Sequence, residues 1–324
     1  MSSIVEHGSK EQSLNPRFNT LDQWLSWQET LHFSEIDLGL DRCGKVAEKM
    51  ELIDVPYLVI TIAGTNGKGS CARMLESILN KSGVRTGCYT SPHLVNYNER
   101  VRVNGTEVQD EQICKAFSII DHNRETTSLT YFEFGTLAAL EIFKNSQIEV
   151  AILEVGLGGR LDAVNILNAD YVILTSIDLD HHEWLGDTRE AIGFEKAGVF
   201  RSTSQIVCAD SQPPASVTAY ASELNSPIYI SKRDFHHQSY NNSWDWHSEE
   251  QTWENLPVPD PYNQCQIENA AAVVKLVELL SPRIPITKQA IYDGLADFSL
   301  KGRFQHIQQS PDIILDVAHN SESI

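Results

Sequence analysis

The segment from Gly64 to Ser70 is rich in glycine and carries one lysine and two hydroxyl groups. This composition is typical of loops that hold phosphate groups, because glycines let backbone N–H groups approach the phosphate oxygens. Lys68 supplies a point charge for the β- and γ-phosphates of a nucleotide, and the hydroxyl of Ser70 or Thr65 can reach a phosphate or its Mg²⁺. The segment therefore predicts a nucleotide-binding loop made of Gly64, Thr65, Asn66, Gly67, Lys68, Gly69 and Ser70.

The surroundings of this loop support the prediction, although its sequence departs from the common phosphate-loop pattern. Ile62 stands where that pattern has its first glycine, and Gly69 separates Lys68 from Ser70. The β-branched run 59–63 predicts a buried strand before the loop, and residues 70–79 predict a helix after it. Because strand, glycines, lysine and helix start coincide, phosphate binding is favoured over a tight turn with an incidental lysine.

Three more polar side chains stand where predicted strands end, namely Ser91, Glu154 and His181. Oxygen ligands with one imidazole suit Mg²⁺ or Mn²⁺ better than zinc. A carboxylate inside an apolar strand, as at Glu154, is costly unless it is paired or metal-bound, so a buried salt bridge is the alternative there. For His181 the alternative is a surface histidine. The spacing around Lys196 indicates only a solvated helix face.

The strands that must position these residues alternate with helices along the chain. Strands are predicted over 59–63, 84–90, 150–155 and 171–176, and helices over 41–50, 110–122 and 132–143, after a first helix that begins at Leu21. This alternation predicts an α/β fold with a P-loop-type parallel sheet flanked by helices. Ligands of such sheets bind beyond the carboxyl ends of the strands, and the candidate loops follow those ends.

The pattern changes after residue 234. Residues 234–256 are polar with three tryptophans, which predicts a small antiparallel excursion whose tryptophans pack in a core or hairpin rather than form a stacking surface. A helix is predicted over 269–280, and the strand 313–317 begins a new domain. We expect a flexible tail over 1–20, a main domain over 21–300 and the start of a C-terminal domain over 301–324.

Bulk properties narrow the class of protein. The 324 residues carry a formal net charge of −19, which argues against nucleic-acid and anionic-membrane partners, since both demand a basic surface. The six cysteines are scattered without a C-x-x-C pair, so neither zinc nor a dithiol site is indicated. The first residues lack the apolar stretch of a signal peptide. A cytoplasmic protein is the expectation.

Ten stretches, in order along nearly the whole chain, make the sequence similar to one family. The most specific is 154–163, Glu-Val-Gly-Leu-Gly-Gly-Arg-Leu-Asp-Ala. The chain resembles the bacterial dihydrofolate synthase/folylpolyglutamate synthases of the Mur ligase superfamily, and this stretch separates that branch from the cell-wall Mur ligases. The other stretches are 36–40, 64–70, 90–94 with 99–103, 129–133, 180–181 with 184–186, 195–198, 269–271, 302–304 and 316–320.

The resemblance implies roles for the polar residues. Residues 64–70 would bind the ATP phosphates, with further nucleotide contacts from Asn269, Arg303, Asp316 and His319. Ser91, Glu154 and His181 match the Mg²⁺ ligands of the family. Lys196 matches a lysine that family members carry as a carbamate, which would hold a second Mg²⁺. Lys68, Lys196 and His181 are thereby the catalytic candidates.

The resemblance also implies a substrate and a reaction. ATP would phosphorylate the carboxylate of dihydropteroate or of a folate, and the amine of L-glutamate would attack the acyl phosphate, in a monomeric, ADP-forming ligase of folate synthesis. Placement and charge neutralisation would be the protein's task, without a side-chain nucleophile. Phe132 would stack on the pterin. The matching pteroate-pocket positions are Asp37, Leu38, Gly39, Leu40, Thr130, Tyr131, Phe132, Glu133, Leu161, Asp162 and Ala163.

The C-terminal end departs from the family pattern. Relatives continue with a complete α/β domain that covers the nucleotide and helps to form the glutamate site, whereas this sequence ends at Ile324, just after the first strand of that domain. A truncated C-terminal domain is therefore expected. This departure leaves one alternative to the ligase, an inactive fragment that binds ATP and pterin. A second alternative is a cell-wall Mur-type amino-acid ligase, which would share the nucleotide loop and its lysine.

Overall fold

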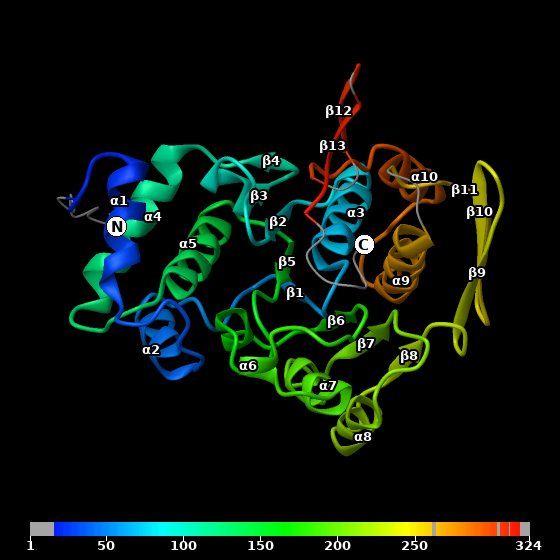
Figure 1. Cartoon of the computed structure of the whole chain (residues 1–324), viewed down its shortest axis with the longest axis horizontal. Coiled ribbons are helices and arrows are strands. Elements are labelled where there is room, and N and C mark those ends of the chain that lie inside the picture. Colours follow the sequence, from blue (N-terminus) through cyan, green and yellow to red (C-terminus); the bar gives the residue numbers. More distant parts are fainter. Residues whose placement is uncertain (1–15, 261–263, 303–304, 311, 318–324) are drawn as a thin grey trace, which may run out of the picture.

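A computed structural model describes residues 16–260, 264–302, 305–310 and 312–317. Its centre is an eight-stranded sheet of order β4-β3-β2-β5-β1-β6-β7-β8 (Figure 1). The run from β2 to β8 is parallel, which confirms the predicted sheet, while β3 and β4 add an unpredicted antiparallel edge. The strands are β1 (Leu58–Ala63), β2 (Thr86–Tyr89), β3 (Val101–Val103), β4 (Thr106–Glu107), β5 (Val150–Glu154), β6 (Tyr171–Leu174), β7 (Gln205–Cys208) and β8 (Ile228–Ile230).

The register of the central strands brings their carboxyl ends together. In β1, Ile62 pairs with Glu154 of β5, and Ala63 pairs with Leu174 of β6. Glu154 is the last residue of β5, and Lys68, Ser91 and His181 follow the ends of β1, β2 and β6. One edge of the sheet therefore presents all four predicted segments, as expected for ligand binding in parallel sheets.

Helices cover both faces of the sheet, and each face has its own apolar core (Figure 1). This burial on both faces explains why the central strands are apolar runs rather than alternating patterns. On one face lie α1 (Leu21–Leu31), α2 (Asp41–Lys49), α4 (Asp110–Arg124), α5 (Tyr131–Asn145), α7 (Arg189–Ala197) and α8 (Ala215–Glu223). On the other lie α3 (Lys68–Lys81), α9 (Gln264–Leu280) and α10 (Lys288–Ala296). Shorter pieces are α6 (His182–Leu185), η1 (Tyr97–Arg100) and η2 (Ala163–Ile166).

The predicted antiparallel excursion is a three-stranded sheet of β9 (Phe235–Ser239), β10 (Ser243–Ser248) and β11 (Thr252–Pro257). Trp244 and Trp246 are completely buried, and the Trp246 indole N–H donates to the carbonyl of Ala271 in α9 at 3.0 Å. The packing interpretation of the tryptophans is confirmed for these two residues. The excursion packs on α9 and α10.

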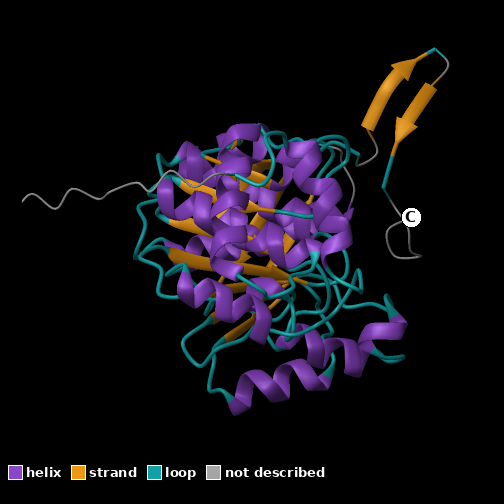
Figure 2. Ribbon diagram, turned by 90° about the vertical axis from the view of Figure 1, so that its left-hand side faces the viewer, coloured by secondary structure: helices purple, strands orange, loops and turns teal. Residues whose placement is uncertain are grey.

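The two ends of the described chain differ in how they pack against the rest of the protein. Near the start, Arg17 pairs with Asp121 at 2.8 Å and the Phe18 ring lies 5.3 Å from that of Trp24, so this part of the predicted tail packs on the helices. At the other end, β12 (Gln305–Gln309) and β13 (Asp312–Leu315) form a hairpin that stands away from the body (Figure 2). No helix among the described residues is long and apolar enough to cross a membrane.

Candidate active site

The predicted nucleotide loop connects the buried strand β1 to α3, and two of its glycines are required by close contacts. Gly64 has φ +143°, and a Cβ there would lie 1.7 Å from the Thr175 hydroxyl oxygen. Gly67 has φ +85°, and a Cβ there would lie 2.5 Å from the side-chain oxygen of Asn269. Only glycine fits at these positions. Asn269 of α9 therefore packs directly on the loop, and its contact with the nucleotide stays a prediction. Helix α3 begins at Lys68, two residues before the predicted start.

Two lysines converge on one carbonyl of this loop. The Lys68 ammonium donates to the carbonyl oxygens of Gly64 at 3.0 Å and of Thr65 at 2.9 Å. The Lys196 ammonium, from the last turn of α7, donates to the same Gly64 oxygen at 2.8 Å. Lys196 is only 4% exposed, so the solvated helix face that its spacing indicated is wrong, while its place beside the nucleotide loop agrees with the resemblance.

The loop hydroxyls are held by neighbouring elements. Thr65 exchanges two hydrogen bonds of 3.1 Å with the backbone of Asp178, which ties the loop to the segment after β6. Ser70 is buried and accepts a hydrogen bond from the Gln266 side chain at 3.1 Å. Gln266 was not predicted as a site residue, because a single glutamine just before the predicted helix 269–280 carries no functional signal.

Glu154 lies between the nucleotide loop and the end of β2. Its carboxylate accepts the backbone N–H of Ser91 at 3.0 Å, and a Cβ added to Gly69 would lie 3.8 Å from both of its oxygens. The side chain is buried, with 5% of the residue exposed. The structure thus brings together Lys68's loop, Ser91 and Glu154, as the sequence predicted.

His181 is more exposed than Glu154. Its side chain is 52% exposed, and its Nε2 lies 3.7 Å from the carboxylate of Asp180. It lines the same cleft as Ser91. Within the described ranges, no group of three or more His, Cys, Asp or Glu side chains is placed to hold a metal ion. A Ser91–Glu154–His181 set, which contains only two such residues and a hydroxyl, stays a prediction.

A cleft of about 810 Å³ opens beside these residues at the carboxyl edge of the sheet. Ser91 and His181 belong to its wall together with every predicted pteroate position except Leu40, which precedes α2. The lining residues from the predicted set are Asp37, Leu38, Gly39, Thr130, Tyr131, Phe132, Glu133, Leu161, Asp162 and Ala163. Three segments far apart in the sequence therefore form one cavity.

Aromatic rings and one buried cation shape this cleft. Phe132 lies against Gly156, where a Cβ would come within 2.7 Å of the ring, and its centroid lies 5.8 Å from that of Tyr89. Arg100 also lines the cleft, is 9% exposed and donates from Nε to His93 Nδ1 at 2.8 Å. Arg100 belongs to the stretch 99–103, yet no role was predicted for it from the sequence.

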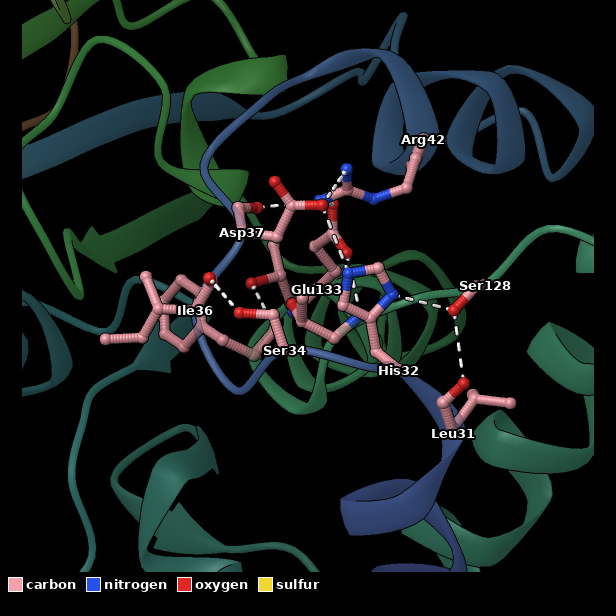
Figure 3. Close-up of polar contacts among 11 residues, drawn as sticks. Leu31, His32, Ser34, Ile36, Asp37, Arg42, Ser128 and Glu133 are labelled. Atoms are coloured by element: carbon pink, nitrogen blue, oxygen red, sulfur yellow. Dashed lines mark hydrogen bonds and ion pairs between the residues drawn. The ribbon is translucent and has the colours of Figure 1, made fainter.

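A polar corner of the cleft joins α5 to the segment between α1 and α2 (Figure 3). At the start of α5, Thr130 and Glu133 form a capping box, in which each side chain accepts the other's backbone N–H. Arg42 lies 3.1 Å from Glu133 and donates to the Asp37 carboxylate at 2.6 Å. His32 lies 3.1 Å from the same carboxylate. Arg42 and His32 were not predicted from the sequence.

Asp162 is a second buried carboxylate of the cleft. Burial raises its pKa to about 6, although the backbone N–H groups of Leu157 and Val164 donate to it at 2.8 and 3.0 Å and the charge of Lys68 opposes the shift. These bonds hold the glycine-rich segment after β5 in its folded shape. The side chain is thus fixed in the wall of the cleft and is costly to ionise there.

The raised pKa of Asp162 predicts how stability varies with pH. The folded protein holds this proton more tightly than the unfolded chain, so the contribution of Asp162 is full below about pH 4 and is lost as pH rises to about 6. The free energy of unfolding of the wild type, relative to that of Asp162→Asn, should fall by about 2 kcal/mol between pH 4.5 and pH 7.5. Chemical denaturation across this range measures the change.

The exposed carboxylate Asp54 provides the control. Asp54→Asn makes the same chemical change without burial, so its difference from the wild type should stay constant within about 0.5 kcal/mol. A flat difference for Asp162→Asn as well would show that this carboxyl has an ordinary pKa.

The C-terminal nucleotide contacts are only partly described. Asp316 is exposed just after β13, and the neighbouring Val317 N–H donates to the Gly302 carbonyl at 3.0 Å. A Cβ on Gly302 would lie 3.0 Å from Leu94, so this segment contacts the loop that follows β2. Arg303 and His319 lie outside the described residues, and their predicted roles stay predictions.

Comparison with known proteins shows which class of protein has this fold and site. Residues 62–268 match the Mur ligase middle domain, a range that runs from the end of β1 through the nucleotide loop and the other strands of the central sheet to the start of α9. The computed structure superposes on E. coli FolC in complex with DHPP and ADP with a TM-score of 0.88 at 44% identity, covering 94% of this chain and 72% of that one. A bifunctional folylpolyglutamate synthase/dihydrofolate synthase with Mn, AMPPNP and L-glutamate gives 0.86 at 43% identity, covering 94% and 72%.

Sequence relatives narrow the class to a family. The dihydrofolate synthase/folylpolyglutamate synthase of Haemophilus influenzae is 44% identical over 317 residues, which cover 93% of this chain and 71% of that protein. The E. coli K12 protein of the same name is 44% identical, with 93% and 70% covered. The chain belongs to the dihydrofolate synthase/folylpolyglutamate synthase family, and it spans about 70% of the length of these relatives.

Proposed function

We propose that this chain carries out the ATP-dependent ligation of L-glutamate to dihydropteroate and to folates. One observation carries the proposal: the cleft that holds the predicted pteroate positions shares Ser91 with the group that includes Glu154 and the nucleotide loop. An acid in the cleft and the γ-phosphate of ATP on the loop would therefore meet at the carboxyl edge of the sheet. The family's named activities and the ligands of its solved members, DHPP, ADP, AMPPNP, Mn and L-glutamate, support this reading.

The chemistry needs an activated carboxylate. An oxygen of the pteroate or folate carboxylate attacks the γ-phosphorus of ATP, and ADP leaves. The amine of L-glutamate then attacks the acyl carbon, phosphate leaves, and the amine loses a proton to form the amide. Lys68 and the backbone N–H groups at the start of α3 would neutralise the charge that develops on the phosphoryl oxygens. Phe132 would stack on the pterin ring system and Arg100 would balance the acid's charge.

Divalent metal ions complete the proposal. A carboxylate and a hydroxyl are donors that Mg²⁺ and Mn²⁺ accept, so Glu154 and Ser91, which the structure joins, fit such an ion, with His181 as a further ligand from the cleft wall. The ion would neutralise phosphate charge when bound. We propose two ions, the second held by Lys196 as a carbamate, because Lys196 is buried beside the nucleotide loop and a carbamate would turn its charge negative.

The test is ADP release with this chain, ATP, Mg²⁺ and each of dihydropteroate and tetrahydrofolate, with and without L-glutamate. Release that requires both the pterin acid and L-glutamate is the expected result. Binding of AMPPNP and dihydropteroate without release would support the fragment that binds but does not turn over. Absence of binding by both ligands would contradict the site itself.

The setting of the reaction is also part of the proposal. We propose a monomer that works in the cytoplasm on small-molecule substrates and has no nucleic-acid or membrane partner. The net charge of −19 supports this, since it disfavours polyanionic partners. The six cysteines are all free thiols, which suits a reducing compartment.

A further inference from the structure

His32 occupies an unusual place in the cleft. It lies between α1 and α2, and its side chain is only 5% exposed although it belongs to the cleft wall. Its Nε2 lies 3.1 Å from Asp37 Oδ2 (Figure 3). Because a carboxylate only accepts hydrogen bonds, Nε2 carries the proton of this contact. The ring therefore donates to a carboxylate that itself lines the cleft.

The other side of the ring is anchored. His32 Nδ1 lies 2.7 Å from the hydroxyl of Ser128, which also contacts the Leu31 carbonyl at 3.1 Å. Ser128 stands just before α5, so the imidazole bridges the segment after α1 to the helix that carries Phe132 and Glu133. Two fixed contacts on opposite ring nitrogens leave the imidazole one orientation.

Two side chains, Arg42 and His32, contact the same carboxylate oxygen of Asp37. Arg42 Nη1 donates to Oδ2 at 2.6 Å, and Arg42 Nη2 donates to the backbone carbonyl of Asp37, also at 2.6 Å. The His32 bond reaches the same Oδ2. Oδ1 can then accept a hydrogen bond from a ligand, and the Asp37 side chain keeps 32% of its surface exposed.

The order Ser128–His32–Asp37 resembles a nucleophilic triad in composition but not in arrangement. Ser128 is absent from the residues that line the cleft, and its hydroxyl is engaged with the Leu31 carbonyl. A nucleophile must reach the substrate. The contacts instead run from the protein interior toward Asp37, so they favour a positioning role over a catalytic one.

We propose that His32 is a positioning residue for the pterin substrate: anchored on Ser128, it fixes the Asp37 carboxylate so that its second oxygen accepts N–H donors of the bound ring system. This inference rests on the proposed function. His32 acts only through Asp37, since its own ring is buried and both of its nitrogens are engaged within the protein. Its loss therefore weakens pterin binding and leaves nucleotide binding unchanged.

Two substitutions separate the two ends of the imidazole. The amide nitrogen of His32→Gln reaches roughly where Nε2 lies and can still donate to Asp37, whereas that of His32→Asn stands near Nδ1 and cannot. Calorimetry should show dihydropteroate bound about tenfold more weakly by His32→Asn and within about threefold of wild type by His32→Gln. The affinity for AMPPNP with Mn²⁺ should change less than twofold in both. Equal affinity of His32→Asn and wild type for dihydropteroate would overturn the inference.

A double-mutant cycle with Asp37→Asn keeps the inference testable if His32→Asn is destabilised. His32 acts through Asp37, so adding His32→Asn to Asp37→Asn should weaken dihydropteroate binding less than twofold further. A full tenfold loss in that background, or a matching loss of AMPPNP affinity, would mean general damage and would overturn the inference. If the wild type itself binds AMPPNP but not dihydropteroate, that result contradicts the proposed function, independently of the His32 variants.

Discussion

Replacing Lys68 by alanine should lower the rate of ADP formation by about 10³-fold, the largest effect expected of any single change in this chain. Lys68 is the first residue of α3, and its ammonium lies within 3.0 Å of two carbonyl oxygens of the nucleotide loop. A phosphate on the loop would replace these weak partners with full negative charge. Steady-state rates, and the affinity for AMPPNP, which should fall about 100-fold, measure the loss.

Lys81→Ala is the matched control. Lys81 is the last residue of the same helix, is exposed and pairs with Asp297, so its removal changes the same charge without touching the loop. It should leave the rate and the AMPPNP affinity within about twofold of wild type. The Lys68→Ala protein should keep its affinity for dihydropteroate. A Lys68→Ala enzyme with more than a tenth of the normal rate would assign the phosphate role to another group.

Glu154→Gln should lower the rate about 10²- to 10³-fold and raise the Mn²⁺ concentration needed for half-maximal activity. The substitution keeps the size of the side chain, and its amide oxygen can still accept the Ser91 N–H that lies at 3.0 Å in the wild type. The substitution removes one negative charge beside the start of α3. The loss should therefore appear in metal dependence rather than in stability, which a Mn²⁺ titration at saturating ATP measures.

Glu149→Gln tests whether position on the strand matters. Glu149 directly precedes β5, at the opposite end from Glu154, and its side chain is 50% exposed. The variant should be indistinguishable from wild type in rate and Mn²⁺ requirement. If Glu154→Gln shows an unchanged Mn²⁺ requirement but a lower melting temperature, Glu154 is a structural carboxylate that only holds the Ser91 loop.

Long apolar runs made most of the fold predictable. The strands β1, β5 and β6 were found because they are buried on both faces and therefore read as continuous β-branched stretches. Short strands such as β3 and β4 were missed, since two or three residues give no period to detect. The start of α9 was placed five residues late, because its first turn is selected by the contact of Gln266 with Ser70 rather than by apolar spacing.

Site residues could be predicted from the sequence where neighbouring residues of one segment together indicate a function, as in the nucleotide loop and at the end of β5. They could not be predicted where the site is assembled from residues of several segments. Lys196 gave no signal from spacing because its burial arises when α7 packs on Gly159, where a Cβ would lie 2.8 Å from the Glu195 carbonyl. His32 and Arg42 are single polar residues whose roles depend on Asp37 and Glu133, and only the folded structure shows those pairings.

The hairpin of β12 and β13 has a consequence for handling the protein. Ile307, Ile313, Ile314 and Leu315 are each between 41% and 58% exposed on a ribbon with both outer edges unpaired in the described structure. Bare strand edges flanked by aliphatic side chains invite other copies to pair with them. Concentrated samples should scatter light progressively, and a mild detergent should suppress the scattering without changing ligand affinity.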